Sequence, residues 1–155
     1  MKKKILKIVL ALVIIFVACN IIWFAWSHIK YGKFSSGMQE GDFSNFITPR
    51  YIYTDADRYV YLVKYPDYLS FTGNLCVGMP ATEETFFTDA LIIWPKVSGG
   101  YQFGALLYDE NVEYSIYIDS EGNALSKEDE DIVSRHRDTI RNLLIIADEK
   151  WDICE

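Results

Sequence analysis

The sequence predicts an α+β domain joined to one membrane-spanning helix. Three observations lead to this prediction: a long uncharged apolar segment near the N-terminus, short runs rich in β-branched and aromatic residues, and an amphipathic helical pattern at the C-terminus. We place the boundary after Lys33, so that residues 1–33 hold a cytoplasmic start and an anchor, and residues 34–155 an exported domain. A chain of 155 residues leaves room for one such domain.

The anchor is predicted from Ile8 to Trp26, a segment without a charged side chain. As a helix it is about 28 Å long, close to the hydrocarbon thickness of a bilayer. Trp23, Phe24 and Trp26 lie at its far end, and aromatic rings favour the lipid–water interface. Four lysines precede the segment and two follow it closely, which predicts a cytoplasmic N-terminus and a domain outside the cell.

Two other processing routes remain as alternatives. The stretch Phe16-Val17-Ala18-Cys19 loosely resembles a lipobox, which would make Cys19 a lipidation site, although that motif prefers Leu at the position of Phe16. A cleaved secretory signal would need a shorter apolar core that ends in a small-residue site. All three routes export the C-terminal domain.

Charge is divided sharply along the chain. Six of the fifteen basic residues precede Phe34, whereas all 22 acidic residues follow it, so the domain has nine basic residues and a formal charge of −13. A surface of this sign repels nucleic acid and anionic lipid headgroups, and it attracts cationic partners. We therefore exclude nucleic-acid binding.

The exported domain is predicted to form an antiparallel sheet. It begins with a polar tether over residues 35–42 and a short helical turn over residues 43–47, which Pro49 ends. Strands are predicted over residues 59–65, 69–79 (with a turn or bulge at 73–74), 90–94, 101–108 and 112–118. The connections between them are short, which favours antiparallel neighbours.

A C-terminal amphipathic helix is predicted from about Lys127 to Trp151. Ser126 lies at the N-cap position, and four acidic residues in the first turn interact favourably with the helix dipole. Apolar residues then recur at helical spacing, so one side of the helix should pack across a face of the sheet. This stripe consists of Ile132, His136, Ile140, Leu143, Leu144, Ala147 and Trp151.

The opposite face of the sheet is the predicted partner-binding surface. If the helix covers the more apolar set of strand residues, several tyrosines lie on the other face. Tyrosine favours protein interfaces because its rigid ring buries a large area and its hydroxyl stays polar. The alternative is that these tyrosines only shield a small sheet. The candidate residues, including acidic ones near the last hairpin, are Tyr59, Tyr61, Tyr65, Asp109, Glu110, Glu113 and Tyr117.

Catalytic chemistry leaves little trace in the sequence. It has no Gly-rich phosphate loop, G-x-S-x-G elbow or Cys/His metal spacing, so we expect neither an enzyme nor a bound metal or cofactor. His136 falls on the helical stripe, where we expect a packed histidine, and Asp55-Ala56-Asp57 is typical of a solvated turn. Cys76 and Cys154 are predicted to be separate thiols, with a disulfide between them as the alternative.

The chain resembles the TipC-type immunity proteins of streptococci and related Gram-positive bacteria. The resemblance lies in the Lys-rich start, the Ile8–Trp26 anchor, the segment Tyr59-Val-Tyr-Leu-Val-Lys-Tyr65 and the helix over Ser126–Trp151, and it extends over most of the chain. It implies a small domain outside the membrane that binds and blocks an antibacterial toxin. That toxin would be delivered by type VII secretion and would attack the cell-wall precursor lipid II.

An inhibitor of this kind needs no catalytic groups, only a complementary surface. A strongly negative domain would associate faster with a cationic toxin, by roughly 10–10³-fold. We also hypothesise that Asp109, Glu110 and Glu113 mimic the pyrophosphate of the toxin's substrate and so occlude its active site. The competing interpretation is an anchored sensor or accessory subunit of a cell-envelope complex. A divergent surface enzyme would instead have a deep pocket lined by carboxylates.

Overall fold

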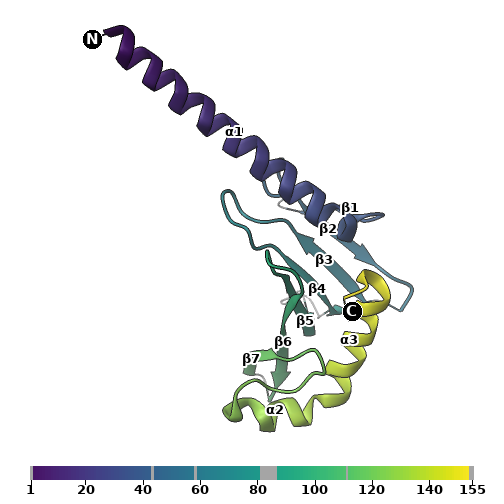
Figure 1. Cartoon of the computed structure of the whole chain (residues 1–155). Helices are drawn as coiled ribbons and strands as arrows, with labels where there is room; N and C mark the ends of the chain where they lie inside the picture. The colour runs from purple at the N-terminus through teal and green to yellow at the C-terminus, as the bar shows by residue number, and fades with distance from the viewer. Residues whose placement is uncertain (1, 43, 58, 81–86, 111, 154–155) are drawn as a thin grey trace.

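The computed structural model describes the whole chain except residues 1, 43, 58, 81–86, 111 and 154–155. Helix α1 (Lys2–Ser35) extends away from a domain formed by a seven-stranded sheet and the C-terminal helices (Figure 1). The predicted α+β class is confirmed. Helix α1 is also long and apolar enough to cross a membrane.

The sheet is an antiparallel meander in which each strand pairs with its neighbours in sequence. The five predicted strands are present, and two further strands at one side of the sheet were not predicted. Strand β2, next to the short edge strand β1, has the sequence Arg50-Tyr-Ile-Tyr-Thr54, which is rich in aromatic and β-branched residues and is a recognisable strand pattern in retrospect. The strands are β1 (Gln39–Glu40), β2 (Arg50–Thr54), β3 (Val60–Lys64), β4 (Asn74–Pro80), β5 (Phe87–Pro95), β6 (Tyr101–Asp109) and β7 (Val112–Ile118).

Two loops replace elements that were predicted as regular structure. Residues 69–73 precede β4 instead of belonging to it, and Leu69 has a positive φ of 60°. The helical turn predicted over residues 43–47 is absent from residues 44–48, where 46–48 form bends, and residue 43 lies outside the described residues. There the side chain of Asn45 accepts hydrogen bonds from the backbone N–H groups of Ile47 and Thr48 at 3.0 and 2.8 Å. Such local side-chain bonds compete with helix formation, which explains the bends.

The predicted C-terminal helix is divided into three parts. A 3₁₀ turn, η1 (Lys127–Asp129), leads into α2 (Glu130–Arg135), and α3 (Arg137–Trp151) follows after a break at His136. The Ser126 hydroxyl accepts a hydrogen bond from the N–H of Glu128 at 3.3 Å, as expected of an N-cap. The break at His136 turns α2 toward the β6–β7 hairpin.

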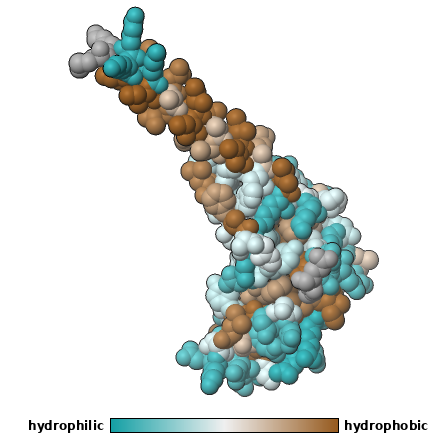
Figure 2. Space-filling model, viewed as in Figure 1, coloured by the Kyte–Doolittle hydropathy of each residue, from teal (hydrophilic) through white to brown (hydrophobic). Residues whose placement is uncertain are grey.

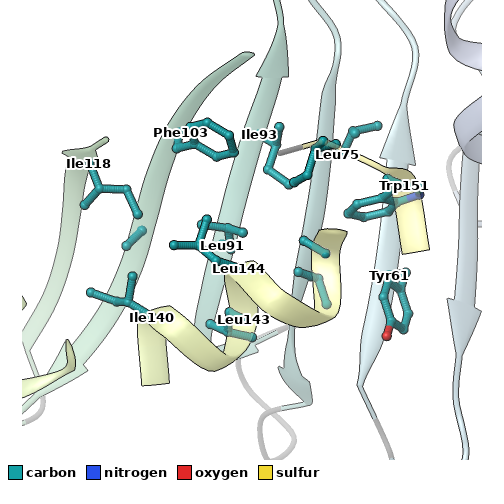
Figure 3. Close-up of a cluster of buried hydrophobic side chains, with 14 of the residues drawn as sticks. Tyr61, Leu75, Leu91, Ile93, Phe103, Ile118, Ile140, Leu143, Leu144 and Trp151 are labelled. Carbon is teal, nitrogen blue, oxygen red and sulfur yellow. The ribbon is translucent and has the colours of Figure 1, made fainter. Parts of the chain in front are cut away.

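The main core lies between α3 and one face of the sheet (Figure 3). The predicted stripe of α3 is confirmed, since Ile140, Leu143, Leu144, Ala147 and Trp151 are all buried. Alternate strand residues meet this stripe from the sheet. They are Tyr61, Val63, Leu75, Val77, Leu91, Ile93, Phe103, Ala105, Leu107, Ile116 and Ile118.

The last turns of α1 belong to the same core. Tyr31 is 0% exposed, and its hydroxyl accepts a hydrogen bond from the N–H of Gly73 at 2.8 Å. The indole N–H of Trp151 donates to the carbonyl of Phe34 at 3.1 Å, which joins the ends of α3 and α1. The predicted polar tether over residues 35–42 is wrong, because α1 continues to Ser35 and β1 then joins the sheet by pairing with β2. The orientation of the domain relative to α1 is fixed by these contacts.

Candidate functional site

Helices cover one face of the sheet and leave the other without a helix among the described residues. The second apolar cluster of the domain lies on this other face and consists of strand residues alone. We call it the uncovered face. Its apolar members are Val60, Cys76, Phe87 and Ala90, which are buried, and Ile52, Leu62, Ile92 and Leu106, which are partly buried.

The strand register aligns the side chains of the uncovered face in rows. Each residue of a row is paired with the next across the sheet, and the central row is apolar. This central row consists of Ile52, Leu62, Cys76, Ile92, Gly104 and Tyr117. The next row on one side holds the polar side chains of Arg50, Lys64, Asn74 and Gln102, together with Trp94, which pairs with Gln102.

An aromatic pair lies at the β7 end of the central row. The rings of Trp94 and Tyr117 are 5.8 Å apart between centroids. Trp94 lies over Gly104, where an added Cβ would be only 2.9 Å from the indole ring. Because glycine has no side chain, the indole ring of Trp94 can pack against β6 at this position. Tyr117 is 55% exposed, so the pair presents an aromatic surface to solvent.

Three of the predicted binding residues lie on the wrong face for that role. Tyr61 and Tyr65 are 5% and 3% exposed and face the helices. The hydroxyl of Tyr59 accepts a hydrogen bond from the side-chain amide of Asn142 in α3 at 2.9 Å. The predicted location of these tyrosines opposite the helix is wrong. Burial raises the pKa of Tyr61 and of Tyr65, as expected for enclosed phenols.

Of the remaining predicted residues, Tyr117 and Glu113 lie on the uncovered face, whereas Asp109 is in register with the residues that face the helices. Tyr117 and Glu113 point away from the helices, as predicted, and Glu113 accepts a hydrogen bond from the hydroxyl of Tyr108. Asp109 and Glu110 lie at the β6–β7 hairpin, and Asp109 forms an ion pair with Arg135 of α2 at 2.7 Å. Two of the three acidic groups proposed as pyrophosphate mimics thus have partners within the chain.

Sequence reasoning missed Trp94, Ile92 and Leu62 as candidate interface residues. The run Ala90-Leu-Ile-Ile-Trp94 is apolar at every position, which is typical of a strand with two apolar faces. Only one of these faces can meet the C-terminal helix. The other face must contact something else or remain exposed. The all-apolar run therefore indicated a second apolar face of the sheet.

The histidine, aspartate and cysteine side chains that could carry chemistry are held in contacts within the fold, as far as the structure describes the chain. It contains no group of three or more His, Cys, Asp or Glu side chains that could hold a metal ion. The Nδ1 atom of His136 lies 3.5 Å from a carboxylate oxygen of Asp89, and Asp55 accepts hydrogen bonds in the β2–β3 turn from Tyr59 and Tyr61. Cys76 is a free thiol in the central row, and burial raises its pKa to about 12, which keeps it protonated. Cys154 lies outside the described residues.

Comparison of the chain with protein-family models, with curated proteins and with solved structures gave no match. The uncovered face is therefore interpreted from its own geometry and chemistry.

Proposed function

We propose that the chain is a membrane-anchored binding protein whose uncovered face holds a protein partner. The observation that carries this proposal is the apolar central row with the Trp94–Tyr117 pair at its end. The solvent-accessible part of this face consists of the partly exposed Ile52, Leu62, Ile92 and Trp94 together with the 55% exposed Tyr117, and contiguous apolar surface of this kind commonly marks an interaction site. An apolar centre with polar groups such as Lys64 and Glu113 at its margin has the composition of a protein interface.

Helix α1 supports the anchoring part of the proposal. Figure 2 shows apolar side chains over most of α1, between a hydrophilic tip and the domain. Many of these side chains are exposed, including Ile8, Leu12, Ile15 and Ile22. A bilayer would remove them from water, whereas water alone would leave a long apolar cylinder exposed. We propose that the N-terminus is cytoplasmic and the domain external, as the flanking lysines predict.

Within this class, we propose an immunity protein that neutralises a type VII-secreted toxin directed at lipid II. The resemblance of the anchor, β3 and the C-terminal helical region supports this proposal, as does the charge of −13 on the domain. The fixed junction between α1 and the sheet would hold the inhibitor at the membrane surface, where a toxin acting on a lipid-linked precursor must work. The aromatic pair, rather than the acidic hairpin, is the proposed centre of contact.

The alternative is a sensor or accessory subunit of an envelope complex that uses the same face. The continuity of α1 with the core favours it, since partner binding at the sheet could move the transmembrane helix directly.

Gene deletion separates the two functions. For an immunity protein, we expect deletion to leave growth of a pure culture unchanged and to sensitise the cells only when they meet toxin-producing neighbours. Full-length protein with Ile145→Ala should restore resistance, because that exposed side chain lies on the outer side of α3. Protein with Tyr117→Ala should not restore it. An envelope defect without any toxin producer would contradict the immunity role and favour the subunit.

A further inference from the structure

Two loops of the domain lie beside the apolar segment of α1. The hydroxyl of Tyr68 contacts the side-chain oxygen of Asn20, and the indole N–H of Trp23 donates to the carbonyl of Ser70 at 2.7 Å. The β3–β4 loop therefore runs back along α1 to the level of residues 20–26 (Figure 1). This level lies inside the predicted membrane span.

The β1–β2 loop reaches the same level from another side. The ring of Phe46 stacks on Phe24 of α1, with centroids 5.2 Å apart, and the ring of Phe71 contacts Trp26 at 5.3 Å. In an antiparallel meander, alternate connections lie at the same end of the sheet. The β1–β2, β3–β4 and β5–β6 loops thus form the end of the domain that surrounds α1.

The length of the apolar segment places these loops within the membrane. Before Asn20, the uncharged part of α1 covers residues 8–19, which is about 18 Å of helix. The hydrocarbon core of a bilayer is about 30 Å thick, so the span must also use residues 20–26. A bilayer that α1 crosses therefore extends to the level of the two loops.

The loops have the chemistry of a lipid-facing surface. Residues 43–49 and 68–73 include no charged side chain, and the one acidic residue of each loop, Asp42 and Asp67, lies close to the strand that precedes the loop. Phe46 is 81% exposed, and Leu69 and Phe71 are exposed as well. Leu69 also has a left-handed backbone, which is costly for a non-glycine residue and is often found at functional positions. Exposed aromatic and aliphatic side chains at this level favour the membrane interface.

Basic residues follow at the level of the lipid headgroups. A pocket of about 240 Å³ between α1 and the β5–β6 loop is lined by Lys30, Lys33 and Lys96, among others. Lys30 and Lys33 lie about 6 and 10 Å beyond Trp26 along the helix, which is the depth of the headgroup layer. The net charge of the domain predicts repulsion of anionic headgroups. At the end of the domain next to α1, these lysines attract them instead.

We propose that the β1–β2 and β3–β4 loops insert into the outer leaflet and that the lysine pocket binds anionic lipid phosphates. We call this the seating surface, formed by Phe46, Leu69, Phe71, Lys30, Lys33 and Lys96. It fixes the height and tilt of the domain, and so directs the uncovered face at a set angle to the membrane. The inference rests on the proposed span of α1, and it goes beyond partner binding.

Depth-dependent fluorescence quenching tests the insertion. In the full chain, an environment-sensitive fluorescent amino acid takes the place of Ile14, Phe46, Phe71 or Val112, one at a time. Val112 is the matched control, since it is an exposed apolar residue at the opposite end of the sheet. The proteins are reconstituted in phosphatidylcholine–phosphatidylglycerol vesicles that contain lipids spin-labelled either near the carbonyl region or, in a parallel sample, in the middle of the acyl chain.

We expect strong quenching at positions 46 and 71, several-fold above that at position 112. Quenching by a mid-chain spin label at position 14, without quenching at 46 and 71, would leave the anchor intact and overturn the seating. No quenching at position 14 would contradict the anchor itself, and the seating with it.

Vesicle composition tests the lysine pocket. Adding phosphatidylglycerol to phosphatidylcholine vesicles is expected to increase quenching at position 71, and the double variant Lys33→Gln, Lys96→Gln should lose this increase. The control Lys127→Gln removes a distant exposed charge and should keep it. An increase that survives in the double variant would overturn the phosphate contact, whereas loss of the increase in excess inorganic phosphate, but not in sodium chloride of the same ionic strength, would support it.

Discussion

Replacing Tyr31 by alanine is expected to lower the free energy of unfolding of the full chain by about 3–5 kcal/mol. The ring of Tyr31 is fully buried and lies 5.6 Å from that of Tyr65 between centroids. The substitution would leave a cavity and would also deprive the N–H of Gly73 of its hydrogen-bond acceptor. Urea unfolding in detergent micelles, followed by near-ultraviolet circular dichroism, measures the loss.

The matched control for Tyr31 is Ile29→Ala, two residues earlier in α1. Ile29 is largely exposed, so its truncation should change the free energy of unfolding by less than about 0.5 kcal/mol. A chain shortened to begin at Phe34 should be as destabilised as Tyr31→Ala, whereas one beginning at Trp23 should keep its core. Equal stability of the two shortened chains would mean that the end of α1 is not part of the domain.

The second large effect is expected at Tyr117, in partner affinity rather than stability. With the purified partner, Tyr117→Ala should weaken binding by roughly 30-fold or more, which corresponds to about 2 kcal/mol. Tyrosine and tryptophan side chains at the centre of an interface commonly account for losses of this size. The stability of the free domain should change by less than about 1 kcal/mol, because Tyr117 is more than half exposed.

Two further variants show which part of the Tyr117 contact matters. Tyr117→Phe keeps the ring and should retain most of the affinity if ring burial dominates. Ile145→Ala removes a similarly exposed apolar side chain from the outer side of α3 and should leave affinity unchanged. Calorimetric titration of purified partner gives all the values, and a Tyr117→Ala protein with undiminished affinity would contradict the proposed contact.

The parts of the fold that could be predicted have a local pattern with a clear polar side. The C-terminal helical stripe stands out because charged and polar residues occupy most of the other positions, with Ile145 as an exposed exception, and all but His136 of its predicted members are buried. The buried side of strand β7 was predicted correctly, because the polar Glu113 and Ser115 lie on one side of the strand and the apolar Ile116 and Ile118 on the other. In such elements, the buried side can be read from the sequence alone.

Strand β3 shows why the face of the tyrosines could not be predicted. Its two sides hold Tyr61 and Val63 on one and Val60 and Leu62 on the other, so both are apolar. Apolarity therefore does not decide which side meets the helices. The structure places the tyrosines inside because their hydroxyls find partners there, as that of Tyr61 does on Asp55 at 2.9 Å.

The contact between α1 and the sheet depends on residues far apart in sequence. Tyr31 and Gly73 are 42 positions apart, and no local pattern links them. The spacing of Trp23, Ser27 and Tyr31 at intervals of four residues places them on one side of α1, and all three are buried. In the sequence, this side is concealed by the apolar residues that surround it, so the segment indicated an anchor and not its junction with the core.

Site-specific photo-crosslinking in intact cells is the most direct test of the central claim, that a protein partner occupies the uncovered face. A photoreactive amino acid in place of Tyr117 is expected to form a covalent adduct with the partner, whereas the same amino acid in place of Ile145 should form none. An adduct at position 145 together with none at position 117 would contradict the claim.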